Sequence, residues 1–442
     1  MATVYRPAPK KPASVKGVEE PMGGAFQMAT IEQQGIAAKA AAANLMLCST
    51  ETKNTALSSI ADALISNCDR ILVANRIDME NARQSGMTPA LLDRLELNRD
   101  RIAGIAQGVR DVVALNDPIG QIDKLETRPN GLVIGRQSVP LGVIAIIYEA
   151  RPNVTVDAAV LCLKAGNAVI LRGGKEAYNS NVATVGIMRD AINAAGLPVN
   201  AVSLVSDTSH DSVDELLKAT KYIDVLIPRG GAGLIDHVVA NARVPVIETG
   251  VGNCHVYVES SADLQMAEKI VYNAKCRRPS VCNAAETLLV DRKIAAEFLP
   301  MAKRSLDLRE TQLRGCPETV KILGDSVVPV TEEDYYEEFL DYILAVKVVA
   351  GFDEAVAHIT KYGTKHSEAI VTNDYSASQR FLSEVDAAAV YVNASTAFTD
   401  GGEFGLGAEI GISTQKMHAR GPMGLNELTT SKFIIYGNGQ VR

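Results

Sequence analysis

A cysteine with three cationic side chains close upstream, Cys282, stands in the run Lys275-Cys-Arg-Arg-Pro-Ser-Val-Cys282. Nearby positive charge lowers the pKa of a thiol, so more of the nucleophilic thiolate is present at neutral pH. On a loop between a predicted helix and a predicted strand, such a thiolate could attack an activated carbonyl carbon. The same local sequence also fits a small cysteine packed in an apolar core.

A glycine-containing turn, Arg229-Gly230-Gly231-Ala-Gly233, follows a predicted strand over 223–227 and opens a predicted helix. Glycines at such a turn let the backbone approach a dinucleotide, with helix amides facing its anionic groups. The spacing is not that of the GxGxxG fingerprint, and a purely structural turn fits as well.

A second turn, Arg172-Gly173-Gly-Lys175, follows a predicted strand over 168–171. Its two cations could bind a phosphate group, for which the 2′-phosphate of NADP is the attractive candidate. Solvated arginine and lysine side chains on an ordinary turn are the alternative.

Two polar residues lie where predicted strands end. Asn153 stands between a strand and a helix, where its side chain could cap the helix or donate to a developing oxyanion. Glu248 ends a predicted strand over 244–247 and could be a base, a cofactor contact or an anchor for loop amides.

The elements that must position these residues are helices and strands in regular alternation after Asn153. Such alternation is typical of parallel sheets with helices on both faces, so the sequence predicts an α/β fold with two successive doubly wound domains. Two β-like runs, 131–136 and 142–147, predict in addition an extended ribbon, which could dock on a partner subunit or form a peripheral hairpin of the same monomer. We expect these units at 1–27 (a disordered leader), 28–126 with 148–254 (a dinucleotide-binding domain with a helical N-terminal layer), 127–147 with 411–442 (the ribbon element) and 255–410 (the domain that carries Cys282).

Composition excludes several classes of protein. The formal net charge of −8 and the pI near 5.5 argue against binding to nucleic acid or to a membrane surface. Apolar runs such as 143–148 are too short to span a bilayer, and the N-terminal stretch lacks the apolar segment of a signal peptide. Seven cysteines without CxxC pairs, and histidines without metal-ligand spacing, predict neither a disulfide framework nor a metal site. We therefore expect a cytoplasmic protein with reduced thiols.

In their order on two α/β domains, Asn153, Glu248 and Cys282 resemble the aldehyde dehydrogenase superfamily. Longer runs are similar to one of its families, the γ-glutamyl phosphate reductases, over nearly all of the chain from about Met28. These runs are Arg151-Pro-Asn-Val-Thr-Val-Asp157, Leu226-Ile-Pro-Arg-Gly-Gly-Ala-Gly233, Pro279-Ser-Val-Cys-Asn-Ala-Ala-Glu-Thr287, Phe398-Thr-Asp-Gly-Gly-Glu-Phe-Gly-Leu-Gly-Ala-Glu-Ile-Gly411, Ala419-Arg-Gly-Pro-Met-Gly-Leu425 and Tyr436-Gly-Asn-Gly-Gln-Val-Arg442.

The resemblance implies an aldehyde-dehydrogenase-like fold and NADPH-dependent reduction of L-glutamyl 5-phosphate to glutamate 5-semialdehyde, with release of phosphate, in proline biosynthesis. It implies that Cys282 is the nucleophile, Asn153 the oxyanion donor and Glu248 the counterpart of the superfamily's general base. Glu338 matches the glutamate that contacts the cofactor ribose, although the usual Phe-Gly-Pro continuation is absent here. A homo-oligomer built through the ribbon, and association with glutamate 5-kinase, are further expectations.

Three cations near these motifs, Arg151, Lys275 and Arg278, are candidates for binding the phosphate or the α-carboxylate of the substrate. Two rival functions stay open. One is a hydrolytic NAD(P)-dependent aldehyde dehydrogenase, and the other is a catalytically silent dinucleotide-binding scaffold.

Overall fold

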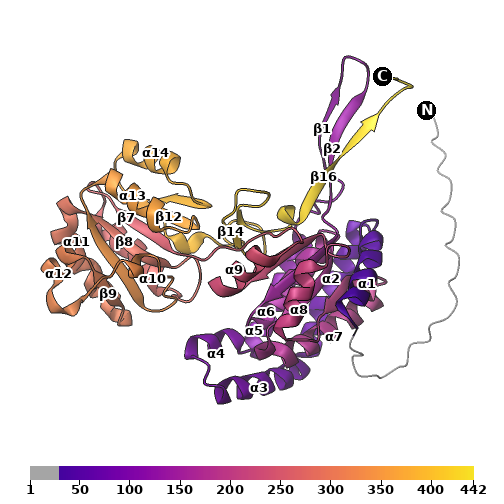
Figure 1. Ribbon diagram of the computed structural model, residues 1–442, viewed down its shortest axis with the longest axis horizontal. Coiled ribbons are helices and arrows are strands. Elements are labelled where there is room, and N and C mark those ends of the chain that lie inside the picture. The colour runs from indigo at the N-terminus through magenta and orange to yellow at the C-terminus, as the bar shows by residue number, and fades with distance from the viewer. Residues whose placement is uncertain (1–28) are drawn as a thin grey trace.

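A layer of five helices precedes the first sheet in the computed structural model, which describes residues 29–442 (Figure 1). The predicted leader over 1–27 lies outside the described residues. Short polar side chains start the helices: the Thr30 hydroxyl accepts from the amide of Gln33, whose own side chain accepts from the Thr30 amide. The helices are α1 (Ile31–Leu45), α2 (Thr50–Ser66), α3 (Cys68–Gln84), α4 (Pro89–Leu95) and α5 (Arg99–Ala114).

The first α/β domain is built on a four-stranded parallel sheet of order β5-β4-β3-β6. Its strands read as nearly continuous apolar runs because helices cover both faces. The chain adds strands on one side of β3 and then returns to the other, so the carboxyl ends of β3 and β6 flank a switch point, where such sheets bind ligands. The elements are β3 (Val143–Tyr148), α6 (Pro152–Lys164), β4 (Ala168–Gly173), α7 (Tyr178–Ala194), β5 (Val202–Leu204), α8 (His210–Lys218), β6 (Val225–Arg229) and α9 (Ala232–Asn241).

The ribbon differs from the prediction. The run 142–147, expected in the ribbon, forms most of β3, a fully buried strand inside the first sheet. The ribbon is an antiparallel sheet of order β1-β2-β16, built from β1 (Ile122–Thr127), β2 (Val133–Pro140) and β16 (Thr429–Tyr436). The predicted boundaries were wrong because an apolar run shows that a strand forms but not which strands it pairs with.

The second α/β domain contains a seven-stranded sheet of order β10-β9-β11-β8-β7-β12-β13, in which all pairs are parallel. Val256 and Val258 pack into one core and Tyr257 between them into another, so both faces of this sheet are covered. The two doubly wound domains are therefore confirmed. The elements are β7 (Cys254–Val258), α10 (Leu264–Cys276), β8 (Ala285–Asp291), α11 (Arg292–Leu306), β9 (Gln312–Gly315), α12 (Pro317–Leu323), β10 (Val328–Pro329), β11 (Ile343–Val349), α13 (Phe352–Tyr362), β12 (Ser367–Val371), α14 (Tyr375–Glu384) and β13 (Ala389–Val392).

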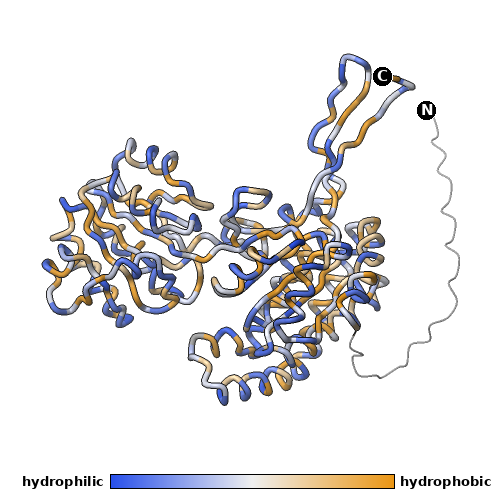
Figure 2. Tube along the Cα trace, in the orientation of Figure 1, coloured by the Kyte–Doolittle hydropathy of each residue, from blue (hydrophilic) through white to orange (hydrophobic). Residues whose placement is uncertain are grey.

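Hydropathy follows this architecture. Figure 2 shows apolar residues gathered along the sheets and hydrophilic residues on the outer helices of both domains. A short pair, β14 (Ile412–Ser413) and β15 (Gly421–Pro422), lies on the segment that returns from the second domain to the ribbon. Among residues 29–442, no helix combines the length and the apolar character needed to cross a membrane.

Candidate active site

A pocket of about 610 Å³ between the two domains contains Cys282. Its first wall is the amino end of α6 with Arg229, the last residue of β6, so it lies at the carboxyl ends of the first sheet. Its second wall is the loop before β8, which carries Cys282, and the glycine-rich loop after β13. The carboxyl ends of one sheet thus face the amino end of a strand in the other.

Burial controls the state of the Cys282 thiol. Burial raises the pKa of this thiol to about 11. The negative charges of Glu409 and Glu338 raise the pKa further, whereas the positive charges of Arg229 and Arg151 lower it. The expectation that cations upstream in the sequence would lower this pKa was therefore wrong. The two cations that act most on the thiol, Arg229 and Arg151, come from the first domain.

Lys275 is removed from the substrate-binding candidates. Its side chain is fully buried and its Nζ lies 2.5 Å from Glu286 Oε2. Burial raises the pKa of Glu286, and the positive charge of Lys275 partly offsets this increase. Glu286 Oε1 also accepts a hydrogen bond from the amide of Leu340 at 3.3 Å. Because Lys275 and Glu286 flank the segment that carries Cys282, this ion pair holds the two ends of the nucleophile's loop together.

The backbone of Cys282 is packed against the segment before β7. A Cβ added to Gly252 would lie 1.6 Å from the Cys282 carbonyl oxygen, so only glycine fits at this position. The Cys254 thiol donates to the same carbonyl at 3.2 Å. Glu338 Oε1 accepts from the Gly252 amide at 2.8 Å, which places this predicted cofactor contact beside the nucleophile's loop, and burial raises its pKa.

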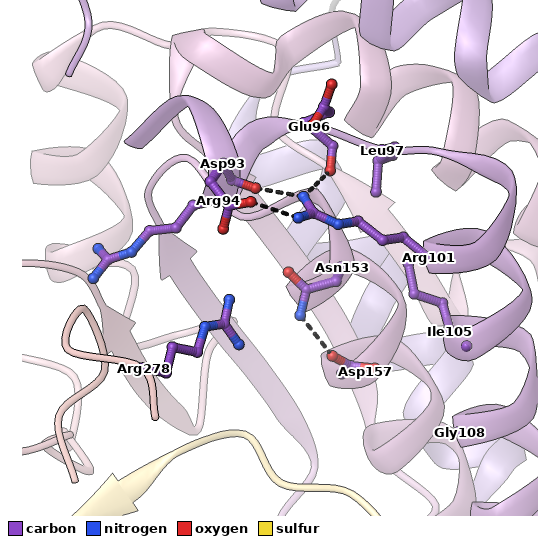
Figure 3. Close-up of a pocket in the computed structure, with 11 residues that line it drawn as sticks. Asp93, Arg94, Glu96, Leu97, Arg101, Ile105, Gly108, Asn153, Asp157 and Arg278 are labelled. Carbon is purple, nitrogen blue, oxygen red and sulfur yellow. Dashed lines mark hydrogen bonds and ion pairs between the residues drawn. The ribbon is translucent and has the colours of Figure 1, made fainter. Parts of the chain in front are cut away.

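Asn153 lies on the wall of the Cys282 pocket, as a catalytic role requires. Arg151 occupies the N-cap position of α6 and Pro152 follows it, so the alternative that Asn153 caps the helix was wrong. Its Nδ2 donates to Asp157 Oδ2 at 3.1 Å, one helical turn further on (Figure 3). This bond fixes the amide with its nitrogen on the side of Asp157.

The structure does not bring the Glu248 carboxylate into the pocket. Glu248 is half-buried on the segment between α9 and β7, and its amide donates to Gln415 Oε1 at 3.2 Å. It is not among the residues that line the pocket. A base role for Glu248 therefore has no support from the geometry.

Arg172 is occupied by its own domain. Its buried guanidinium donates from Nη2 to the carbonyls of Thr208 and Ser209, at 2.7 and 2.8 Å. It therefore holds the loop after β5, and the prediction that it binds a cofactor phosphate was wrong. Gly173 is required by packing, since an added Cβ would lie 2.1 Å from Asn181 Nδ2, whereas Lys175 is exposed and stays a candidate.

The glycine turn before α9 is partly filled by a carboxylate of this chain. Glu149 Oε2 accepts from the Gly231 amide at 2.9 Å, and an added Cβ on Gly230 would lie 2.5 Å from the same oxygen. Gly233 has open space beside it: among residues 29–442, no atom outside its chain neighbours and its own helix backbone lies within 4 Å of an added Cβ. Open space at Gly233 and the exposed Lys175 fit a dinucleotide bound at the carboxyl ends of β4 and β6.

Four residues of the site were not predicted. Arg229 directly precedes the glycine turn, and Asp157 follows Asn153 by one helical turn; both spacings could have indicated a shared pocket. Glu409 comes from the glycine-rich loop, whose glycine content indicates a segment that could line a site, but nothing within the loop singles out this carboxylate. Arg94, on α4, has no such signal either.

Arg94 links the helical layer to the nucleophile's loop. Its Nη2 donates to the carbonyl of Ser280, two residues before Cys282. Arg94 lines a pocket of about 550 Å³ that adjoins the Cys282 pocket and shares Asn153, Asp157 and Arg278 with it (Figure 3). The cleft therefore continues from the thiol toward α4 and α5.

Comparisons with known proteins agree with this architecture. Residues 23–311 match the model of the aldehyde dehydrogenase family. The chain is 61% identical over 405 residues to γ-glutamyl phosphate reductase of Carboxydothermus hydrogenoformans, with 92% of this chain and 97% of that protein covered. The crystal structure of γ-glutamyl phosphate reductase from Thermotoga maritima superposes with a TM-score of 0.90 at 50% identity and covers 94% of this chain and all of that one. The Saccharomyces cerevisiae structure of the same name gives 0.52 at 29% identity, with 94% and 99% covered.

Proposed function

Because this chain belongs to the γ-glutamyl phosphate reductases of the aldehyde dehydrogenase family, we propose that it reduces L-glutamyl 5-phosphate to L-glutamate 5-semialdehyde with NADPH, a step toward proline. The family implies the use of NAD(P), and the choice of NADPH is part of the proposal. The observation that carries the proposal is a half-buried thiol, Cys282, in an interdomain pocket lined by the four arginines Arg151, Arg229, Arg277 and Arg278.

In the first step, the Cys282 sulfur attacks the acyl carbon of the mixed anhydride and the bond from that carbon to the phosphate oxygen breaks. A thioester forms, and the departing phosphate takes up the proton that the thiol gives up. Because phosphate is the leaving group, this step needs no base to activate water, which agrees with the position of Glu248 outside the pocket.

Asn153 is suited to hold the acyl oxygen as it gains negative charge. One N–H of its amide donates to Asp157, and the other is left to donate to the oxyanion beside Cys282. The role of Asp157 toward Asn153 is to orient this amide.

The arginines supply positive charge for the anionic groups of the substrate. Arg151 and Arg278 line the pocket, and neither makes an ion pair within 4 Å among the described residues. A guanidinium forms paired hydrogen bonds with phosphate or carboxylate, so these two side chains can receive either group.

When bound, NADPH supplies the hydride that converts the thioester to the aldehyde and frees the thiol. Lys175, Gly233 and Glu338 are the residues that we propose to contact it. Lys175 follows β4, Gly233 follows β6, and Glu338 lies beside the Gly252 amide.

The ribbon is proposed to join subunits. Apolar side chains are exposed along it: Ile122, Leu125, Phe433, Ile435 and Tyr436. Exposed apolar side chains on an extended β-ribbon indicate a surface that another protein chain covers. We propose a second copy of this chain.

The test is reduction of NADP⁺ with L-glutamate 5-semialdehyde, with and without phosphate. The wild-type protein should be active only with phosphate, and Cys282→Ala should abolish turnover while leaving the melting temperature unchanged. Cys48→Ala, which removes a free thiol that does not line the pocket, is the matched control and should keep full activity. Activity without phosphate would establish the hydrolytic rival, and NADP⁺ binding without any turnover would establish the silent scaffold.

A further inference from the structure

Charges of both signs line the Cys282 pocket without pairing with one another. Arg151, Arg277 and Arg278 form no ion pair within 4 Å among residues 29–442, and neither do the carboxylates of Asp157 and Glu409. Unpaired charges of opposite sign in one pocket match a ligand that itself carries both signs.

The two carboxylates come from different domains. Asp157 lies on α6, where its Oδ2 accepts from Asn153 at 3.1 Å, and Glu409 lies on the glycine-rich loop, where its Oε2 accepts from the Gly401 amide at 2.9 Å. Within the described part of the chain, each of the two carboxylates accepts this one hydrogen bond. One oxygen of each is therefore left to accept from a ligand.

The protein itself only partly neutralises the negative charges of Asp157 and Glu409. Burial raises the pKa of Asp157 to about 6 and that of Glu409 to about 7, with Arg229 as the main opposing charge on Glu409. Arg229 packs against Gly411, where an added Cβ would lie 2.4 Å from its Nη1, and its buried Nε has no hydrogen-bond partner in the described part of the chain. A cation bound between the two carboxylates would recover the free energy that their ionisation costs.

We propose that Asp157 and Glu409 form the subsite for the α-ammonium group of the substrate. The inference rests on the proposed function, because L-glutamyl 5-phosphate carries this ammonium and the α-carboxylate on one carbon, several bonds from the acyl group. An ammonium group offers three donors and no acceptor, which suits two free carboxylate oxygens. The α-carboxylate then lies toward the arginines.

Glu338 and Asp400 are less suited to this role. Glu338 is bonded to the Gly252 amide and does not line the pocket. Asp400 lines it, but its Oδ1 accepts from the amides of Gly402 and Glu403 in its own turn. Asp157 and Glu409 each accept one hydrogen bond, whereas Asp400 accepts two from backbone amides, so the assignment falls on the two lining carboxylates that the protein stabilises least.

The experiment compares L-glutamate 5-semialdehyde with 5-oxopentanoate, which differs only in lacking the amino group. Reduction of NADP⁺ is measured with phosphate present, for the wild type, Glu409→Gln and Asp157→Asn. Each substitution removes the charge and keeps the size of the side chain. We expect the ratio of kcat/KM for the amino substrate over the analogue to fall about 10- to 100-fold in each variant, the size of one hydrogen bond to a charged group.

Glu403→Gln is the matched control, since Glu403 is an exposed acid on the same loop, and its ratio should equal that of the wild type. The pH dependence of KM gives a second readout. The KM of the wild type for the amino substrate, divided by that of Glu409→Gln at the same pH, should fall between pH 6 and pH 8 as Glu409 ionises. Cyclisation of the amino aldehyde affects every enzyme equally, so it cancels in this comparison.

Equal losses for both substrates in Glu409→Gln and Asp157→Asn would overturn the subsite, as would unchanged kinetics. Such a result would leave the proposed function standing. Failure of the wild type to reduce NADP⁺ with either aldehyde in the presence of phosphate would instead refute the function.

Discussion

Cys282 is held as a thiol by burial, in spite of two arginines across the pocket. The effects of Glu409 and Glu338 add to burial, and Arg229 and Arg151 oppose them. A protonated nucleophile is protected from adventitious reagents until substrate arrives. A substrate cation near Glu409 would offset the negative charge of this carboxylate, which raises the pKa of the Cys282 thiol, and would so favour the thiolate.

Alkylation of Cys282 tests this at the scale of the residue. Because the pKa of the thiol lies near 11, the thiolate fraction should rise about tenfold per pH unit below that value. We expect the rate of inactivation by iodoacetamide to rise steadily from pH 7 to pH 9.5. Modification is located by peptide mass spectrometry, with Cys282→Ser as the unlabelled control. A plateau below pH 8 would contradict the raised pKa.

Single residues show where sequence reasoning worked and where it stopped. Cys282 and Asn153 were predicted for one site, and one pocket contains both. Lys275 looked like a free cation because the sequence does not reveal Glu286, its buried partner across the loop. Arg94 could not be predicted, since its contact with Ser280 depends on how the helical layer docks.

At the scale of elements, the nucleophile's loop is fixed at its ends and along its backbone. The buried pair of Lys275 and Glu286 joins its flanks, and Gly252 packs directly against the Cys282 carbonyl. The alternation of strands and helices predicted both sheets. The placement of Cys282 on a loop between a helix and a strand is also confirmed, since the loop lies between α10 and β8.

Substitutions at two glycines test packing and cofactor binding separately. Gly252→Ala should lower the free energy of unfolding by at least ~1–3 kcal/mol and abolish turnover, because its Cβ would overlap the Cys282 carbonyl. The Cβ of Gly233→Ala meets no atom of another part of the described chain within 4 Å, so this variant should keep the free energy of unfolding to within about 0.5 kcal/mol. Its KM for NADP⁺ should nevertheless rise if the turn contacts the cofactor. Denaturant unfolding and steady-state kinetics measure both, and a stable, active Gly252→Ala would refute the packing of the loop.

At the scale of the whole molecule, the ribbon and the two domains have separate roles. The domains enclose the pocket, while the ribbon projects from the first domain (Figure 1). The region 411–442 was correctly predicted to contribute to the ribbon, but β1 and β3 were each placed in the wrong unit. Pairing between distant strands is set by the tertiary fold, which local patterns do not contain.

Self-association should depend on the exposed face of β16. Phe433 and Ile435 point to one side of this strand, and the double substitution F433D/I435D should lower the sedimenting mass to that of a monomer. Lys432→Gln, one residue away on the opposite side, is the control and should leave the mass unchanged. Equal masses for all three proteins would exclude the ribbon as the subunit contact.

Strand β16 also constrains the order of events during synthesis on the ribosome. Arg136 of β2 and Ser431 of β16 are bonded at 2.7 Å although 295 positions separate them in the chain. The hairpin of β1 and β2 emerges early, and one edge of β2 stays open until both α/β domains have been translated. An open edge invites pairing with other nascent chains, which makes this hairpin the segment most exposed to misassembly. The charged and polar side chains along β1, among them Asp123, Lys124 and Glu126, lie beside that vulnerable strand during the whole interval.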